Sequence, residues 1–204
     1  MSSLDRRTEL LAAALRVIAA HGMAGATTRA IVAEAGMPLA SFHYAFTSRD
    51  ELMRELVEHV LDTEALAAAG TLQLGPVGDG DIRTGVRDAL TAYLDTIVAE
   101  PSRELAMFEI AQYALRTPAL RPLAAEQHAR YRVVVSSLLE LGAARAGVHW
   151  STPVDDVARL VVTLTDGIAL AWLADRDREA ALRVIDFAAD SLAGLTIPIE
   201  EPPA

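Results

Sequence analysis

Apolar residues recur every three or four positions along most of the chain, which is the spacing of amphipathic α-helices. The first such segment covers about residues 6–21 and is followed by Gly22, a residue type that commonly ends helices. Its apolar stripe consists of Leu10, Leu11, Ala14, Leu15 and Ile18. No segment alternates apolar and polar residues for long enough to predict a sheet. The pattern therefore predicts an all-α fold.

Two much shorter helices follow. Thr27 or Thr28 can cap a second helix over residues 29–35, and a third spans residues 39–46 after Gly36. Two short helices joined by a turn that contains glycine are the layout of a helix-turn-helix.

The rest of the chain is predicted to be helical up to its last residues. Ser48 and the acidic residues after it begin a fourth helix that extends to about residue 69. Four glycines within residues 70–80 predict a flexible loop. Further helices are expected over residues 81–99, 102–116, 119–145, 153–174 and 177–194. Proline and acidic residues predict a disordered tail over residues 198–204.

Charge is distributed unevenly along the chain. The 204 residues carry a net charge of −10, which taken alone argues against a polyanionic partner. Residues 1–60, however, hold six arginines and seven acidic residues, so that most of the negative charge lies downstream. The N-terminal segment is therefore the part suited to bind nucleic acid.

The sequence predicts a cytoplasmic protein. It contains no cysteine, as fits a reducing compartment, and its start lacks the basic-then-apolar order of an export signal. The most apolar stretch, residues 160–174, is shorter than a bilayer span and carries Asp166 near its centre. We therefore expect a buried helix there and no membrane association.

One segment carries a specific motif. Residues 36–52 are Gly-Met-Pro-Leu-Ala-Ser-Phe-His-Tyr-Ala-Phe-Thr-Ser-Arg-Asp-Glu-Leu, and Thr-Thr-Arg-Ala-Ile precedes them at residues 27–31. This region resembles the DNA-binding region of the TetR family of transcriptional regulators. The resemblance implies a helix-turn-helix domain over residues 1–47 and a helical effector-binding and dimerisation domain over residues 48–197. It implies a ligand-responsive repressor that binds a palindromic operator as a homodimer and is released by a small-molecule effector.

Simple packing physics supports the same motif. A two-turn helix can enter the major groove only if its inner face holds it firmly on the domain. Phe42 and Phe46, four residues apart, supply that inner face. Their expected partners in a small core are Ile18, Ile31, Val32 and Leu52.

The DNA contacts that this docking predicts come from the outer face of the third helix and from neighbouring helix starts. The expected DNA-binding residues are Thr28, Arg29, Leu39, Ala40, Ser41, His43, Tyr44, Ser48 and Arg49. Arg6 and Arg7 are expected to act as an arm along the DNA backbone.

Three residues of the third helix depart from the family's usual pattern. Leu39, Ala40 and Ala45 stand where polar or basic residues, glycine, and histidine or tyrosine are usual. They remove phosphate donors and bring methyl groups to the groove, where thymine methyls are natural partners. The operator sequence itself does not follow from them.

The downstream helices suit a dimer interface and a ligand pocket. Two apolar-rich helices, 153–174 and 177–194, fit a four-helix bundle between two subunits. The residues expected in that interface are Val157, Leu160, Leu164, Gly167, Ile168, Ile185, Ala188 and Leu192. Apolar and polar groups expected to line the effector pocket are Tyr93, Met107, Phe108, Gln112, Tyr113, Arg116, His128, Tyr131 and Trp172.

The sequence also leaves two other classes of protein as alternatives. A helical enzyme is suggested only by Glu55, His59 and Asp62, which share one helical face with metal-ligand spacing. A solvated, salt-bridged face is the simpler interpretation, and no motif calls for a cofactor or a catalytic residue. A helical small-molecule carrier or interaction module that has lost DNA binding is the second alternative, because of Leu39, Ala40 and Ala45 and the acidic total.

Overall fold

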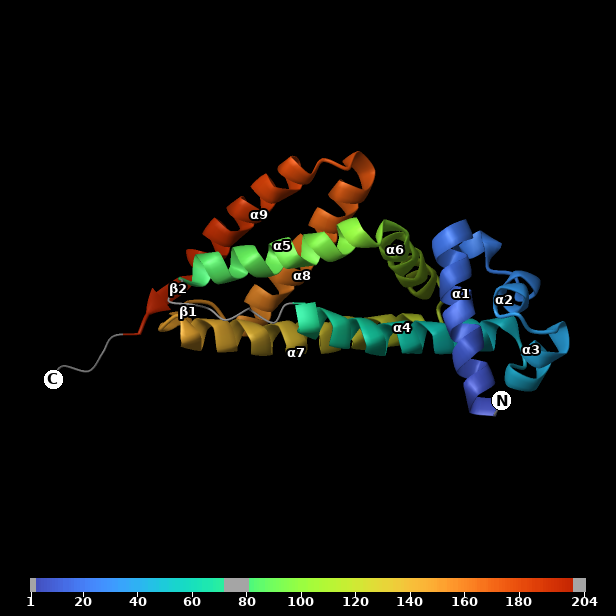
Figure 1. Ribbon diagram of the computed structural model, residues 1–204. Helices are drawn as coiled ribbons and strands as arrows, with labels where there is room; N and C mark the ends of the chain where they lie inside the picture. Colours follow the sequence, from blue (N-terminus) through green and yellow to red (C-terminus); the bar gives the residue numbers. More distant parts are fainter. Residues whose placement is uncertain (1–2, 72–80, 200–204) are drawn as a thin grey trace. The chain divides into compact units, whose positions relative to one another are not determined.

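The computed structural model describes residues 3–71 and 81–199 and confirms the all-α prediction (Figure 1). The helices in these residues are α1 (Ser3–Gly25), α2 (Thr28–Glu34), α3 (Leu39–Ala45), α4 (Arg49–Thr71), α5 (Ile82–Ala99), α6 (Pro101–Arg116), α7 (Arg121–Arg145), α8 (Val154–Asp175) and α9 (Arg178–Ala193). The flexible loop predicted over residues 70–80 falls mostly on residues 72–80, which lie outside the described residues. Its first two residues still belong to α4.

The chain folds into two compact units, which we call the head and the body. The head comprises residues 1–64 and 100–127, and the body comprises residues 65–99 and 128–204. The division runs through α4 and α7. The head therefore contains α6, which the sequence had placed in a separate domain over residues 48–197.

A single apolar core explains why α6 belongs to the head. Ala106, Ile110 and Ala114 of α6 are buried in the same cluster as Phe42 and Leu52. Helix α6 packs along α1, as Figure 1 also shows. The partners predicted for the two phenylalanines, Ile18, Ile31, Val32 and Leu52, all lie in this core, which confirms that prediction.

The turns between the head's helices follow the predicted signals. Gly22 adopts φ 70° and interrupts α1, so that the regular part of this helix ends where the sequence placed its end. Thr27, the first of the two predicted caps, accepts a hydrogen bond from the amide of Ala30 at 3.2 Å. The Ser48 hydroxyl accepts one from the amide of Glu51 at 3.1 Å at the start of α4.

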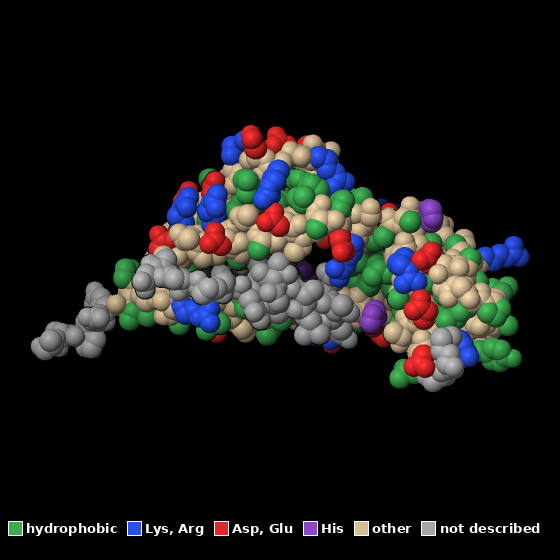
Figure 2. All heavy atoms as spheres, in the orientation of Figure 1, with side chains coloured by type: hydrophobic (Ala, Val, Ile, Leu, Met, Phe, Trp, Pro, Cys, Tyr) green, Lys and Arg blue, Asp and Glu red, His purple; other side chains and the backbone are tan. Residues whose placement is uncertain are grey.

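In the body, α5 and α9 lie side by side and α8 packs against both. Three ion pairs connect α5 to α9, and Figure 2 shows basic and acidic side chains alternating over this face. The pairs are Arg83–Asp190, Arg87–Asp186 and Arg178–Asp95. Because all six side chains are exposed to solvent by about a third or more, these pairs contribute little stability each.

Helix α8 is the most apolar of the described helices. Its 22 residues make it, among the described residues, the one helix that is long and apolar enough to cross a membrane by length and composition alone. The apolar stretch predicted from the sequence, residues 160–174, is shorter than this helix, which begins at Val154. Nine of its residues are buried against the rest of the chain, which is the behaviour of a core helix.

Two short strands were not predicted. β1 (Val148–Trp150) pairs in antiparallel fashion with β2 (Thr196–Pro198), with His149 opposite Ile197. The amide of Ile199 also donates to the carbonyl of Gly147 at 2.9 Å. The first two residues of the expected tail are therefore ordered, and residues 200–204 lie outside the described part.

Candidate nucleic-acid interface

Helix α3 is held on the head by two aromatic rings. Phe42 and Phe46 are 2% and 1% exposed, and their ring centroids lie 5.6 Å apart. The Phe42 ring also meets the His43 ring edge-on at 5.7 Å. The predicted inner face of this short helix is confirmed, so the helix cannot roll without breaking the core.

The outer face of α3 presents the side chains that the sequence assigned to DNA. Tyr44 is 78% exposed, Leu39 is 42% exposed, and Ala40 and His43 are also exposed. Ser41 is half-buried.

Ala45 corrects one detail. It is 4% exposed and lies in the core, so its methyl group is not available to the groove, in contrast to what the departure from the family pattern suggested. A small residue is required there because this position faces the head's interior.

The starts of α2 and α4 bring further predicted residues to the surface. Thr28 is half-buried as the first residue of α2, and Arg29 beside it is exposed. Ser48 is exposed, and its hydroxyl serves as the cap of α4. These placements are compatible with phosphate contacts, which stay predictions.

Arg49, which is predicted to contact DNA, also forms hydrogen bonds within the head. Its Nε donates to the carbonyl of Ala26 at 2.9 Å, and its Nη2 donates to the carbonyl of Met23 at 3.4 Å. The guanidinium thus links α4 to the turn that precedes α2. A phosphate contact by Arg49 would have to be made alongside these bonds.

Arg7 is not a free arm, which corrects the sequence interpretation. Its guanidinium pairs with Glu51 at 2.8 Å and with Glu55, and it lies over the Phe46 ring at 4.6 Å from the centroid. A side chain occupied in this way braces α1 against the α3–α4 junction, and a phosphate contact by Arg7 would have to be made alongside these bonds. Arg6 next to it is half-buried, and its arm role stays a prediction.

The Glu51 carboxylate is the electrostatic centre of that junction. It accepts hydrogen bonds from the hydroxyl and the amide of Thr47, each at 2.6 Å, and one from Arg7. These bonds, those from Thr47 first, lower the pKa of Glu51 to about 2. Glu55, one of the three residues with metal-ligand spacing, accepts a hydrogen bond from Arg7. The side chain of Asp62, another member, lies outside the described residues.

Comparisons with known proteins agree with this geometry over most of the chain. A family model described as bacterial regulatory proteins of the tetR family matches residues 10–56, and one described as the C-terminal part of a BetI-type transcriptional repressor matches residues 82–196. The HTH-type nicotine-responsive transcriptional repressor HdnoR of Paenarthrobacter nicotinovorans is 30% identical over 175 residues, which cover 86% of this chain and 87% of the relative. The chain belongs to the TetR family of transcriptional regulators.

Solved structures extend the likeness to the whole fold. The multidrug binding protein EbrR in complex with malachite green is 30% identical, with a TM-score of 0.60 over 93% of this chain and 97% of EbrR. A TetR transcription regulator from Haloarcula marismortui has a TM-score of 0.74 over 95% of this chain and 99% of its own, at 18% identity. The second likeness shows the fold alone.

The expected pocket residues of this TetR-family regulator are divided between the two units. Met107, Phe108, Gln112, Tyr113 and Arg116 lie in the head, whereas Tyr93, His128, Tyr131 and Trp172 lie in the body. Met107 and Tyr113 pack against the head's core, so their side chains have a structural partner already. Gln112, Arg116 and His128 are exposed, and Phe108, Tyr93 and Tyr131 are half-buried.

Trp172 of the body is the most unusual of these residues. It is 7% exposed, and the guanidinium of Arg176 lies over its ring at 4.5 Å from the centroid. Its buried indole N–H has no hydrogen-bond partner among the described residues.

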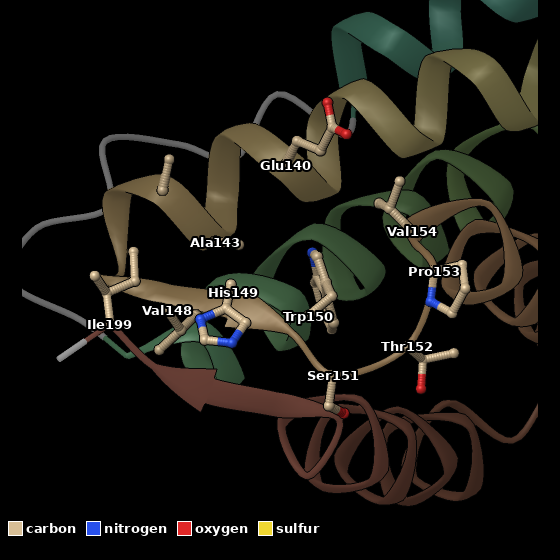
Figure 3. Close-up of a pocket in the computed structure, with 11 residues that line it drawn as sticks. Glu140, Ala143, Val148, His149, Trp150, Ser151, Thr152, Pro153, Val154 and Ile199 are labelled. Atoms are coloured by element: carbon tan, nitrogen blue, oxygen red, sulfur yellow. The ribbon is translucent and has the colours of Figure 1, made fainter.

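A surface hollow of about 530 Å³ lies at the β1 end of the body (Figure 3). It is bordered by the end of α7, by residues 148–154 and by Ile199. Figure 3 shows the side chains of His149 and Trp150, two of the residues that line the hollow, projecting from β1. None of the predicted pocket residues borders it, so this hollow is not the expected effector site.

The structure reassigns most of the expected dimer interface. Five of its eight residues are buried within the chain itself and cannot meet a partner: Val157, Ile168, Ile185, Ala188 and Leu192. Leu160 and Gly167 are exposed, and Leu164 is half-buried. Sequence reasoning missed the large apolar side chains that α8 and α9 do expose, which are Leu170, Val184 and Phe187. Both faces of α8 are apolar, so the spacing alone could not separate them.

Proposed function

We propose that this TetR-family regulator is a repressor that binds a palindromic operator as a homodimer and leaves it when a small effector binds. The observation that carries the proposal is α3, a helix fixed by Phe42 and Phe46 whose outer face presents His43 and Tyr44. A helix of two turns contacts only a few base pairs, so useful affinity requires two copies about one helical turn of DNA apart, roughly 34 Å. Because operators lie on the chromosome, we place the protein in the cytoplasm.

The exposed residues of α3 indicate how it would contact bases. Leu39 and Ala40 offer only apolar groups, and thymine methyls are the apolar groups of the major groove. His43 and Tyr44 add a ring nitrogen and a hydroxyl for base edges or phosphates. We therefore infer an operator in which each half-site contains thymine beside the start of α3.

Selection of bound duplexes from a random pool tests this function. Enrichment of a palindrome with salt-dependent affinity is the expected result. Deoxyuridine in place of each thymidine then removes one methyl group at a time, and a contacted methyl should cost about threefold to fourfold in affinity. The Leu39→Ala variant should bind the thymidine duplex and the deoxyuridine duplex with almost equal affinity.

Two results of the same experiment contradict the proposal. Retention of no duplex at low salt would favour the alternative, a helical carrier that has lost DNA binding. A palindrome whose affinity is indifferent to every thymine methyl would leave the repressor intact but refute the role of Leu39.

The second copy is proposed to cover an apolar surface on α8 and α9. We call this surface the dimer patch and define it as Leu160, Leu170, Val184 and Phe187. Phe187 is 73% exposed, which is unusual for a large aromatic residue on a free surface. Gly167 lies on the exposed side of α8, where a Cβ atom built on it would meet no other atom of the described residues within 4 Å, so that a partner backbone could come close.

The proposed effector is a nitrogen-containing aromatic compound. HdnoR is named as nicotine-responsive, and EbrR was solved with malachite green and with imidazole. In this chain, partial burial raises the pKa of the Asp166 carboxyl, while the charge of His128 lowers it. A cation close to Asp166 would stabilise the ionised carboxylate and would itself be bound more tightly.

Malachite green is a convenient probe of this effector class. We expect saturable binding that weakens about tenfold in Asp166→Asn, which keeps the shape of the side chain but not its charge. We also expect the dye to lower operator affinity, by a coupling free energy of about 1–3 kcal/mol. Equal binding by the variant would refute the role of Asp166.

A further inference from the structure

The turn that joins α1 to α2 is fixed by side chains from outside it. Gly22 has φ 70° and ψ 174°, so the chain leaves the helical path at this residue. The amide of Met23, which follows, donates to the carboxylate of Glu109 on α6. A Cβ atom on Gly22 would lie only 3.1 and 3.2 Å from the two oxygens of Glu109, which indicates how closely the carboxylate approaches the turn.

A second side chain holds the same turn from another helix. Arg49 at the start of α4 donates to the carbonyls of Met23 and Ala26. The next residue, Thr27, caps α2, and α2 packs against α3. The placement of α2 and α3 therefore depends on a turn whose amide is held by α6 and whose carbonyls are held by α4.

Helix α6 has two apolar sides. Ala106, Ile110 and Ala114 are buried in the head's core. Leu105 and Leu115, on the opposite side, are 44% and 55% exposed. Glu109 lies between the two sides, and from there its carboxylate reaches the Met23 amide.

We propose that Glu109 is a positioning residue for operator binding, which holds the turn before α2 from α6. The carboxylate does not touch DNA. It fixes the Met23 amide, the fixed turn orients α2 and α3, and loss of this bond weakens the operator complex. This inference rests on the proposed function, because one of its tests measures affinity for the operator.

Three variants on α6 test the proposal in the full-length protein. Glu109→Ala removes the acceptor and should lower affinity for the selected operator by about threefold to tenfold. Glu109→Gln keeps an acceptor oxygen for the amide and should recover most of that loss. Ser102→Ala truncates an exposed polar side chain on the same helix and serves as the control, with wild-type affinity expected.

Two further measurements separate positioning from other effects. The salt dependence of binding should be unchanged in Glu109→Ala, because no phosphate contact is lost. Hydrogen exchange at the Met23 amide should become faster in Glu109→Ala than in Glu109→Gln, whether or not DNA is present. This exchange test remains decisive even if the wild-type protein binds no operator, so that a failure of the proposed function is distinguishable from a failure of the Glu109–Met23 contact.

The outcomes that overturn the inference are specific. Operator affinity equal to wild type in Glu109→Ala would show that the contact does not position α2 and α3. Unchanged exchange at Met23 would show that the bond is not maintained in solution. Equal losses in Glu109→Ala and Glu109→Gln would show that charge, and not the hydrogen bond, is what α6 contributes.

Discussion

The head and the body use their apolar and charged residues in opposite ways. In the head, apolar side chains meet in one core, and arginines such as Arg7 and Arg49 are engaged in contacts that hold one helix to another. In the body, arginines form exposed pairs along α5 and α9, and the dimer patch leaves Phe187 uncovered. The head packs its apolar residues into a core that holds α3, whereas the body exposes large apolar side chains on α8 and α9.

This difference also decides what each region requires of its residues. Phe42 packs in the closely packed core of the head, so a change in the size or shape of its side chain should destabilise the fold. Phe187 is 73% exposed, so the fold should tolerate a change of its side chain, and the proposed dimer should be affected most. The two phenylalanines therefore provide the sharpest tests of the contrast.

The largest effect is expected from Phe42→Ala. Removal of a fully buried ring lowers the unfolding free energy by about 3–5 kcal/mol. This loss is a large part of the total stability of a typical domain. Denaturant unfolding followed by circular dichroism measures the loss, and Tyr44→Ala is the control on the exposed side of the same helix. A destabilisation below about 1 kcal/mol would show that the ring does not anchor α3.

The next effect is expected from Phe187→Glu, which places a charge in the dimer patch. The chain should fold as before but sediment as a monomer, and operator affinity should fall by roughly 100-fold or more because two linked half-site contacts become one. Val133→Glu, at an exposed apolar position of α7 outside the patch, is the matched control. A variant that remains dimeric would move the interface elsewhere on the protein.

The smallest effect concerns the acid sensitivity of the α3–α4 junction. Because the folded protein lowers the pKa of Glu51 from 4.5 to about 2, this carboxylate stabilises the fold above its ordinary pKa. That contribution is lost as the pH falls from about 4.5 towards 2. Unfolding free energy measured at pH 6 and at pH 3 should therefore differ less in Glu51→Gln than in the wild type. Parallel pH profiles for the two proteins would contradict the assignment.

Helix positions in both regions could be predicted from the sequence, because glycine, proline and capping residues punctuate the apolar pattern. The outer and inner sides of α3 could also be predicted, with Ala45 as the exception. Its methyl group is small enough to suit either side, so only the packing of the head shows which one it occupies.

Three features could not be predicted because they depend on contacts between distant parts of the chain. Arg7 has the same appearance in the sequence as Arg6, and only the approach of α4 gives it two carboxylates. The inclusion of α6 in the head requires the match between its small residues and α1. The strands β1 and β2 have three residues each and are separated by two helices. Each is too short to show the alternation of apolar and polar residues that predicts a strand.

The small β1–β2 sheet has a consequence for the dimer patch. Helices α8 and α9 are joined at one end by a tight turn, in which Arg176 adopts φ 59°. At their other end, the pairing of His149 with Ile197 and the bond from Ser151 to Leu195 connect the start of α8 to the end of α9. The two helices are thus connected at both ends, which restrains them from sliding along each other and fixes the spacing between Leu170 and Phe187. A partner that binds this surface must therefore match that spacing.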